Sequence, residues 1–575
     1  MFLPMTPEEM RAQDIDRCDV ILVSGDAYID APHIGVAVVG RVLQAAGFTV
    51  GIVAQPRSDT AEDILRLGEP RLFWGVSAGS VDSMVANYTA LMKKRRSDDY
   101  TPGGENTRRP DRASIVYANL IRRFGVDKRP IVLGGIEASL RRIAHYDYWD
   151  DAVRRSLLFD AKADILVYGM GEGTVLGLAR RLREGAPVDD LAGTCVIARE
   201  AHAEYITLPA YEDVRHDATA FTEMFRLFYD NLDPRSAKGL QQRHGDRWLR
   251  HHPPAAYESQ DELDRVYALP FERDAHPRYR REGALRALDT IRFSLQTHRG
   301  CYGECNFCAI AVHEGRTVRW RSEESVLREA GRFAAHPAFR GVIPDVGGPT
   351  ANMYGYECAK KLRSGACRDQ RCMFPTLCAS MPVDHSRYTR LLGRIRALPA
   401  VRHVFVASGI RHDLVMSDTH CGEEFLRALV EHHVSGQLRL APEHADDGIL
   451  ALMGKGSFDD VLDFRKRFFT LTRAAGKKQQ LSYYFIAAYP GCGEEEMRHL
   501  RKRIAEEARI DAEHVQVFTP TPSTWASVMY HSERNPFTGE TLFVERGLKG
   551  KRAQKESVLG TSPGKTTGAR GHGPR

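Results

Sequence analysis

Three cysteines, Cys301, Cys305 and Cys308, form a CxxxCxxC motif that is the most chemically specific pattern in the sequence. Their loop contains Gly303 and directly follows the strand-like segment IRFSLQTHRG at 291–300. Three thiolates on one turn can bind three irons of a cubane cluster and leave the fourth iron without a protein ligand. Such an open iron can bind a chelating small molecule, as metal-assisted chemistry requires. We therefore predict a [4Fe-4S] cluster at these cysteines.

A structural zinc site and a chance cluster of cysteines are the alternatives to an iron-sulfur cluster at this motif. Zinc sites usually pair CxxC knuckles with a second pair of ligands, and three cysteines at this spacing after a strand do not fit that pattern. The cluster interpretation is therefore the stronger one.

Residues 287–545 contain the elements that must position this loop. Amphipathic helical stretches alternate with six strand-like runs, which are IRFSLQTHRG, GVIPDVGG, VRHVFVASG, QLRLAPEH, LSYYFIAAYPG and HVQVFTPTP. This alternation predicts a partial, TIM-like (β/α)6 barrel with its chemistry at the carboxyl ends of the strands.

A CxxxCxxC loop after the first strand of such a barrel, with Phe307 before the third cysteine, resembles the signature of the radical S-adenosylmethionine (SAM) superfamily. The resemblance implies that the open iron chelates the methionine part of SAM. It further implies reductive cleavage of SAM to a 5′-deoxyadenosyl radical, with electrons from a reductant such as flavodoxin or ferredoxin.

The ends of the second and third strands supply candidate SAM contacts. The resemblance implies that the backbone of Gly347 and Gly348 receives the methionine amino group, whereas Pro349 stands where family members often carry Glu. Ser408 and Arg411 are candidates for binding the ribose or the carboxylate of SAM. Arg411 can equally be a surface arginine.

Glu443 and His444 end the fourth strand-like run, and Ala488 to Gly491 end the fifth. The first two side chains are candidates for acid or base catalysis, or else are satisfied polar residues of a loop. The second segment is a candidate wall for the adenosine of SAM.

Residues 1–200 alternate short β-branched runs with amphipathic stretches, which predicts a Rossmann-like, doubly wound, mostly parallel α/β domain. Glycines at 134–135 and 169–173 follow strand-like runs. They either face the ligand crevice of such a sheet or only allow tight turns.

This domain also resembles the cobalamin-binding domains that precede many radical SAM barrels. Those that bind cobalt through a histidine carry Asp-x-His-x-x-Gly, whereas Asp30-Ala-Pro-His33-Ile-Gly35 places the histidine one position late. We therefore expect a domain that binds no cobalamin, or binds it without a protein ligand to cobalt.

A narrower resemblance rests on GGIEASLRRIAHYDYWDD at 134–151 and on DVGGPTANMYG at 345–355 followed by a cysteine-rich insert. Both are similar to the YgiQ-type radical SAM proteins, over about residues 14–545. This resemblance implies fold and cofactors and assigns no substrate.

The insert at 351–383 contains four more cysteines, namely Cys358, Cys367, Cys372 and Cys378. Four thiolates can bind an auxiliary iron-sulfur cluster or a zinc ion. The alternative is a set of buried, reduced cysteines in a lid over the barrel mouth.

The segments outside these two domains are a connector and a C-terminal tail. Residues 201–286 are predicted to be an irregular connector with some helix, and 546–575 a disordered basic tail. The net charge of +6 comes from this tail, which holds eight Lys and Arg and one Glu, so the body is about neutral. The sequence contains no apolar run of membrane-spanning length, and its 11 cysteines suggest metal rather than disulfides, so we expect a cytoplasmic protein.

Two alternative functions remain open. One is a non-catalytic iron-sulfur electron-transfer protein, in which an open iron would have no purpose. The other is an RNA-modifying, methylthiotransferase-like enzyme with RNA or protein as its substrate, suggested by FTPTPST at 518–524. Against it, the C-terminal part of the sequence offers only the basic tail, and no separate domain, for binding nucleic acid.

Overall fold

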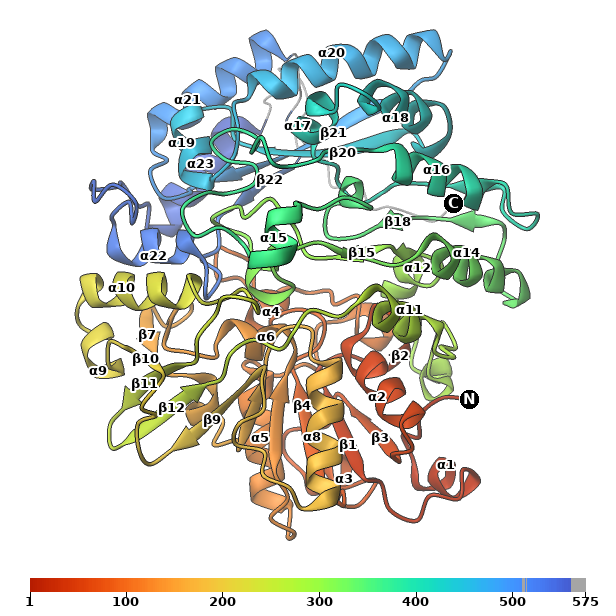
Figure 1. Cartoon of the computed structure of the whole chain (residues 1–575), viewed down its shortest axis with the longest axis vertical. Helices are drawn as coiled ribbons and strands as arrows, with labels where there is room; N and C mark the ends of the chain where they lie inside the picture. Colours follow the sequence, from red (N-terminus) through yellow and green to blue (C-terminus); the bar gives the residue numbers. More distant parts are fainter. Residues whose placement is uncertain (509–511, 513, 560–575) are drawn as a thin grey trace.

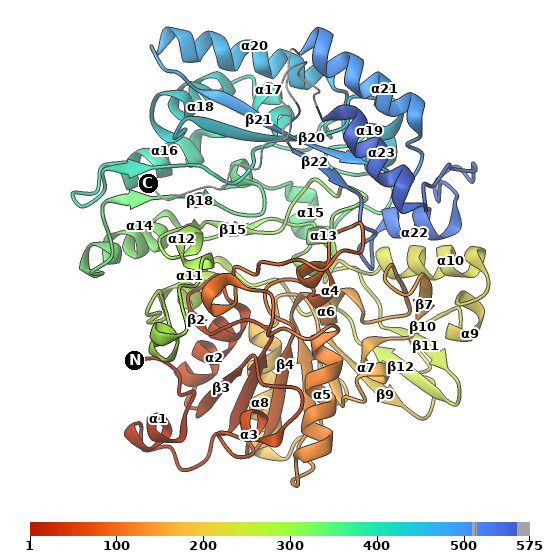
Figure 2. The ribbon, with the colours of Figure 1, turned by 180° about the vertical axis from the view of Figure 1, so that it is seen from behind.

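The computed structural model describes residues 1–508, 512 and 514–559 and shows two α/β parts stacked on each other. The N-terminal domain forms the lower half of Figure 1 and the barrel the upper half, and Figure 2 shows the same arrangement from behind. The predicted fold class, a Rossmann-like domain followed by a partial barrel, is confirmed.

A nine-stranded sheet in the order β10-β11-β12-β9-β8-β5-β4-β1-β3 forms the centre of the N-terminal domain. Strands β3, β1, β4, β5 and β8 are parallel, and β9 and β12 pair antiparallel. The strands are β1 (Val20–Ser24), β3 (Val50–Ala54), β4 (Phe73–Ser77), β5 (Ile131–Gly134), β8 (Ile165–Val167), β9 (Thr194–Ala198), β10 (Ile206–Leu208), β11 (Leu240–His244) and β12 (Arg247–His251).

Helices cover both faces of this sheet because its central strands are buried on both sides. Apolar residues of α2 (Gly35–Ala45) and α8 (Glu172–Glu184) pack in one core, and those of α3 (Ala61–Ile64) and α5 (Ala113–Phe124) pack in the other. The other helices from residue 1 to residue 291 are α1 (Pro7–Ala12), α4 (Ser83–Asn87), α6 (Gly135–Leu140), α7 (Leu157–Asp160), α9 (Tyr211–Val214), α10 (Ala218–Tyr229), α11 (Gln260–Ala268) and α12 (Ala287–Ile291).

Residues 201–286 differ from the predicted connector, because β10, β11 and β12 extend the main sheet. The β11–β12 hairpin turns at Gly245, whose φ of 63° lies in the left-handed region that favours glycine. Its strands carry Gln, Arg and His on buried as well as exposed positions. Such strands lack the apolar alternation by which a strand is recognised in a sequence.

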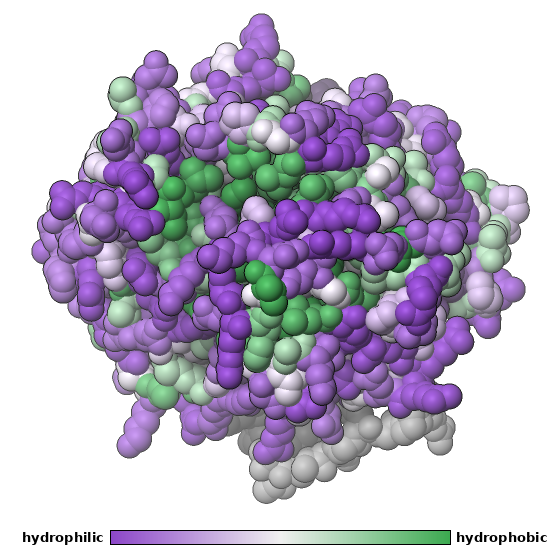
Figure 3. Space-filling view, turned by 90° about the horizontal axis from the view of Figure 1, so that it is seen from below, coloured by the Kyte–Doolittle hydropathy of each residue, from purple (hydrophilic) through white to green (hydrophobic). Residues whose placement is uncertain are grey.

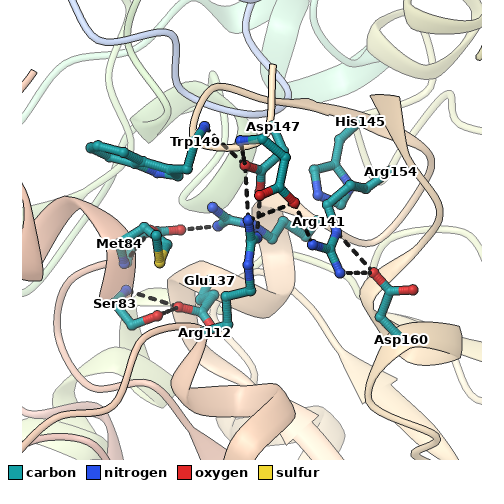
Figure 4. A network of polar contacts seen from close by, with 12 residues as sticks. Ser83, Met84, Arg112, Glu137, Arg141, His145, Asp147, Trp149, Arg154 and Asp160 are labelled. Carbon is teal, nitrogen blue, oxygen red and sulfur yellow. Dashed lines mark hydrogen bonds and ion pairs between the residues drawn. The ribbon is translucent and has the colours of Figure 1, made fainter. Parts of the chain in front are cut away.

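The segment 134–151, which carried the narrower resemblance, forms a buried polar network (Figure 4). Arg112 pairs with Asp147 at 2.6 Å, and the backbone N–H of Ser83 donates to Glu137 at 2.8 Å. This network ties α4, α5 and α6 to the hairpin of β6 (His145–Asp147) and β7 (Ala152–Arg154).

The barrel has six strands, and its strand pairs are parallel: the first pairs with the second, the second with the third, and the fourth, fifth and sixth pair in order. The second is interrupted at Pro344 and appears as β17 (Val342–Ile343) and β18 (Val346–Gly347). The others are β14 (Leu295–Gln296), β19 (His403–Val404), β20 (Gln437–Glu443), β21 (Gln480–Ala487) and β22 (His514–Val517). Helices α14 (Glu323–Arg332), α16 (Ser386–Arg396), α18 (Gly422–Ala428), α20 (Asp459–Ala474) and α21 (Glu494–Lys502) lie between them on the outside.

Part of the predicted disordered tail is a helix, α23 (Leu548–Val558), which packs beside α21 and β22. Lys551 is buried there, and its ammonium donates to the hydroxyls of Tyr148 and Tyr530, each at 2.9 Å. The rest of the predicted tail, 560–575, lies outside the described residues.

The face in Figure 3 is mostly hydrophilic, with hydrophobic residues in recesses between the hydrophilic ones. Within the described part of the chain, no helix has the length and apolar character needed to cross a membrane.

Candidate functional site

The three motif cysteines lie together on the loop that follows β15 (His298–Arg299). Gly300 allows the turn into this loop, because its φ is 85° and a Cβ would lie 2.4 Å from the carbonyl oxygen of Thr317. Inside the loop, the N–H of Cys308 donates to the carbonyl of Cys305 at 2.9 Å.

Hydrogen-bond donors from three segments face the sulfur atoms. The N–H of Gly303 lies 3.4 Å and the hydroxyl of Thr350 3.6 Å from Cys301 Sγ, and Arg411 Nη1 donates to Cys305 Sγ at 3.6 Å. A Cβ on Gly303 would lie 3.3 Å from Cys301 Sγ and 3.6 Å from Cys305 Sγ, so glycine keeps the space between the two sulfurs open.

This donor set fits an iron-sulfur cluster. Burial and the neighbouring thiols raise the pKa of Cys301 and of Cys308, so the thiolates need a cationic partner. Among the described residues, no three His, Cys, Asp or Glu side chains are grouped as they would be around one metal ion. Three cysteines are one ligand short of a closed four-coordinate zinc site, whereas in a cubane each cysteine binds a different iron and one iron stays open.

Gly347 and Gly348 lie beside the start of this loop, as predicted. The carbonyl of Gly347 accepts the N–H of Thr297 at 2.6 Å. A Cβ on Gly348 would lie 2.5 Å from His298 Nε2, so the close approach of this turn to β15 requires glycine.

Ser408 and Arg411 also lie at this end of the barrel, and each already has a carboxylate partner. The hydroxyl of Ser408 donates to Asp345, and its N–H donates to the same carboxylate at 2.9 Å. Arg411 forms a bidentate pair with Asp413, with Nε at 2.9 Å from Oδ1. Arg411 is therefore buried and paired rather than a surface residue, and the SAM contacts of both side chains stay predictions.

Glu443 and His444 have different environments. Glu443 has a left-handed φ of 72°, lies 3.9 Å from Lys455 Nζ and has a pKa raised by burial. His444 is fully buried, and its Nδ1 accepts the N–H of Asp446 at 3.0 Å. Burial lowers the pKa of His444 to about 4, so its ring is neutral near pH 7, and the catalytic roles of Glu443 and His444 stay predictions.

The insert cysteines lie around α15 (Ala359–Ser364), beside the cluster loop. The N–H of Cys378 donates to the carbonyl of Cys372 at 2.9 Å, and Lys361 Nζ donates to Cys372 Sγ at 3.5 Å. The auxiliary iron-sulfur cluster or zinc ion at these four cysteines therefore stays a prediction.

Several residues of the site were not predicted from the sequence. The hydroxyl of Thr350 contacts the sulfur of Cys301, and Asp413 pairs with Arg411. Asp345 accepts a hydrogen bond from Ser408. All three lie within five residues of a predicted SAM contact. Polar residues next to those contacts could therefore have been proposed from the sequence.

The predicted crevice of the N-terminal domain is a cavity of about 330 Å³ between the sheet and the barrel. Its lining includes Gly134, Gly135, Gly169 and Gly171, so most of the predicted glycine turns face it. His33 also lines this cavity.

Comparison with known proteins assigns the chain to a family. The Radical SAM N-terminal model matches residues 2–294, the Radical SAM superfamily model matches 295–504, and a domain of unknown function, DUF3362, matches 513–559. A UPF0313 protein of Fusobacterium nucleatum is 50% identical over 559 residues, which are 97% of this chain and 98% of the relative. The chain belongs to the UPF0313 family of radical SAM proteins.

The UPF0313 protein of Thermotoga maritima is 47% identical over 562 residues, covering 97% of this chain and 98% of the relative. The YgiQ-type resemblance is therefore confirmed. As a radical SAM protein this UPF0313 chain is an enzyme, and its fold supports a [4Fe-4S] cluster and SAM as cofactors.

Two solved structures share the fold of this UPF0313 protein. The radical SAM methyltransferase TsrM from Kitasatospora setae, with tryptophan and a SAM analogue, superimposes with a TM-score of 0.51 at 14% identity over 94% of this chain and 89% of TsrM. The cobalamin-dependent radical SAM enzyme OxsB superimposes with a TM-score of 0.50 at 12% identity over 91% of this chain and 56% of OxsB.

Proposed function

We propose that this UPF0313 protein binds a [4Fe-4S] cluster through Cys301, Cys305 and Cys308 and cleaves SAM reductively. The observation that carries this proposal is the loop itself, which holds three half-buried cysteines, keeps Gly303 between the sulfurs of Cys301 and Cys305, and is faced by Thr350 and Arg411. When bound, the cluster supplies an open iron for SAM and one electron for cleavage to methionine and a 5′-deoxyadenosyl radical.

The protein's own residues would bind and orient SAM. We propose that the Gly347–Gly348 turn offers backbone groups to the methionine amino group, since its glycines leave no side chain over β15. Asp345 orients Ser408 and Asp413 orients Arg411, so both side chains are held in one position before SAM arrives. Arg411 also donates through Nη1 to the sulfur of Cys305 in the cluster loop.

The electron donor and the substrate are proposed by class. We propose an external reductant such as flavodoxin or ferredoxin, and RNA or protein as the substrate that loses a hydrogen atom. An RNA-modifying, methylthiotransferase-like reaction is one form of this proposal, for which FTPTPST at 518–524 is the supporting motif.

The test uses anaerobically reconstituted protein with dithionite and SAM. Wild-type protein should release 5′-deoxyadenosine and methionine, and Cys305→Ala should release neither. The matched control is Cys421→Ala, which removes a half-buried cysteine at the start of α18, away from the cluster loop, and should keep wild-type cleavage. A wild-type protein that holds the cluster without cleaving SAM would instead support a non-catalytic electron-transfer protein.

We also propose that the N-terminal domain works without cobalamin. The late position of His33 in Asp-Ala-Pro-His-Ile-Gly and the cavity volume of about 330 Å³ support this, since that volume lies near the lower limit for drug-sized ligands and a corrin macrocycle is larger. OxsB is described as cobalamin-dependent, but at 12% identity it shares only the fold with this chain, so its cofactor does not carry over. Incubation with hydroxocobalamin followed by desalting should leave no cobalt on the protein, and a stoichiometric complex would overturn the proposal.

A further inference from the structure

The cavity between the N-terminal domain and the barrel lies at the point where the strand order of the sheet reverses. Strand β1 lies between β3 and β4. The chain passes from β1 to β3 on one side and then crosses back to add β4 and β5 on the other side. Open α/β sheets bind ligands outside the carboxyl ends of the strands at this point. Asp26, which follows β1, and Gly79 and Ser80, which follow β4, line the cavity there.

Two helix N-termini supply hydrogen-bond donors to the same cavity. Helix α2 has 11 residues and α8 has 13, and neither N-cap residue, Ile34 or Gly171, caps its helix through a side chain. Both N-cap residues and the first helical residues line the cavity. The free N–H groups of a first helical turn are available to an acceptor on a ligand.

Arg299 and Glu172 add a second, independent indication of a ligand. They pair across the cavity wall at 2.6 Å, and their side chains are only 2% and 8% exposed. Within the described residues, Arg299 Nε has no acceptor and Glu172 Oε2 has no donor. Both residues line the cavity, so this pair gives the cavity a polar wall that carries both a donor and an acceptor.

The deeper part of the cavity is an apolar slot. Leu22, Gly75 and Val132 form one row across β1, β4 and β5 at its floor. Val39 of α2 and Val175 of α8 line it from above. A slot between a sheet and two helices suits a flat ring system.

The charges around the cavity are already balanced by the protein. Asp26 pairs with Arg109 at 2.5 Å, and Arg299 is shared between Glu172 and Glu258. Burial lowers the pKa of His33 to about 3, so this ring is neutral near pH 7. The walls thus offer hydrogen bonds and apolar surface to a ligand. Arg109 and Arg299 are both paired with carboxylates, so neither is free to bind a phosphate group.

We propose that this cavity binds a neutral heteroaromatic molecule with hydroxyl or amino groups, of nucleoside or riboflavin type, at a site separate from that of SAM. The ring lies in the apolar slot, and the polar groups face the helix N-termini and the Arg299–Glu172 pair. Binding contacts the back of the cluster loop, since Arg299 is two residues before Cys301 and Glu314 accepts the N–H of Gly300 at 3.0 Å.

The experiment combines release and rebinding on the full-length protein. Freshly purified protein is heat-denatured and the supernatant is analysed by absorbance and mass spectrometry. The emptied protein is then titrated with riboflavin, adenosine and FMN by equilibrium dialysis. Either a released ligand of this class or micromolar binding of riboflavin or adenosine is expected, and which of the two probes binds distinguishes flavin from nucleoside.

Two tryptophan variants on α2 locate the binding. Val39→Trp fills the slot and should weaken binding at least tenfold, whereas Ala45→Trp, on an exposed position of the same helix, should leave it unchanged. Equal binding by Val39→Trp, tighter binding of FMN than of riboflavin, or no release together with no binding at 1 mM probe would overturn the proposal. None of these readouts depends on SAM cleavage.

Discussion

Replacing Arg411 with Gln removes a positive charge that lies beside a predicted cluster ligand. Arg411 Nη1 is 3.6 Å from Cys305 Sγ, and at an effective dielectric constant of about 20 a unit charge at that distance is worth about 4.6 kcal/mol. This is an upper value because the electron that reduces a cluster is shared among its irons and sulfurs. The carboxylate of Asp413, which also lies beside Arg411, opposes the effect.

We expect the reduction potential of the cluster to fall by about 50 to 150 mV in Arg411→Gln, since 59 mV corresponds to about 1.4 kcal/mol for one electron. The double variant Arg411→Gln with Asp413→Asn removes both charges and should shift the potential by a smaller amount. The assay is a redox titration followed by electron paramagnetic resonance, without SAM.

The matched control is Arg439→Gln, which removes an exposed arginine of β20 in the same barrel. Its potential should equal that of wild-type protein. A potential for Arg411→Gln within 20 mV of wild type, with the cluster fully assembled, would refute the assignment of Arg411 as a positioning residue of the cluster.

Three further predictions follow from buried contacts. Thr350→Val removes the hydroxyl 3.6 Å from Cys301 Sγ and should lower the cluster potential by a few tens of mV at unchanged iron content, measured in the same titration. Burial lowers the pKa of Lys551 to about 8, below its unfolded value of about 10.4, so the unfolded chain binds more protons between these pH values. The unfolding temperature of wild type relative to Lys551→Met should therefore rise from pH 8 to pH 10, and a constant difference would contradict this. Replacing Cys372 and Cys378 by Ser should leave about four irons per chain, because the Lys361 ammonium already donates to the Cys372 sulfur, and a loss of iron would reveal the auxiliary cluster.

The sequence was most informative where the pattern is local. The cysteine loop is defined by spacing within eight residues, and the parallel strands are defined by apolar runs between helices, so both could be predicted. The polar strands β11 and β12 have no such pattern, because Gln242 and His251 are buried through tertiary contacts. Helix α23 was missed for a similar reason, since Lys551 is buried against two tyrosines that lie elsewhere in the chain.

Contacts between strand ends could not be predicted, because they depend on how the barrel brings distant segments together. Thr350 lies 49 positions from Cys301 and Arg411 lies 106 positions from Cys305. Predicting SAM contacts for Ser408 and Arg411 placed these residues at the correct end of the barrel. The sequence pattern did not show that Asp345 and Asp413 already hold them.

Hydrogen bonds to both halves of the molecule hold the cluster loop in place. Glu304 accepts from Arg316 at 3.1 Å and from Tyr229 of α10 in the N-terminal half at 3.2 Å. The N–H of Asn306 donates to Met453 at 2.9 Å, and the carbonyl of Asn306 accepts the N–H of Ala526 at 2.8 Å. In small zinc domains, by contrast, metal binding supplies the folding free energy. Because Glu304 and Asn306 already tie this loop to both halves of the fold, the donors around the sulfurs can serve to tune the cluster.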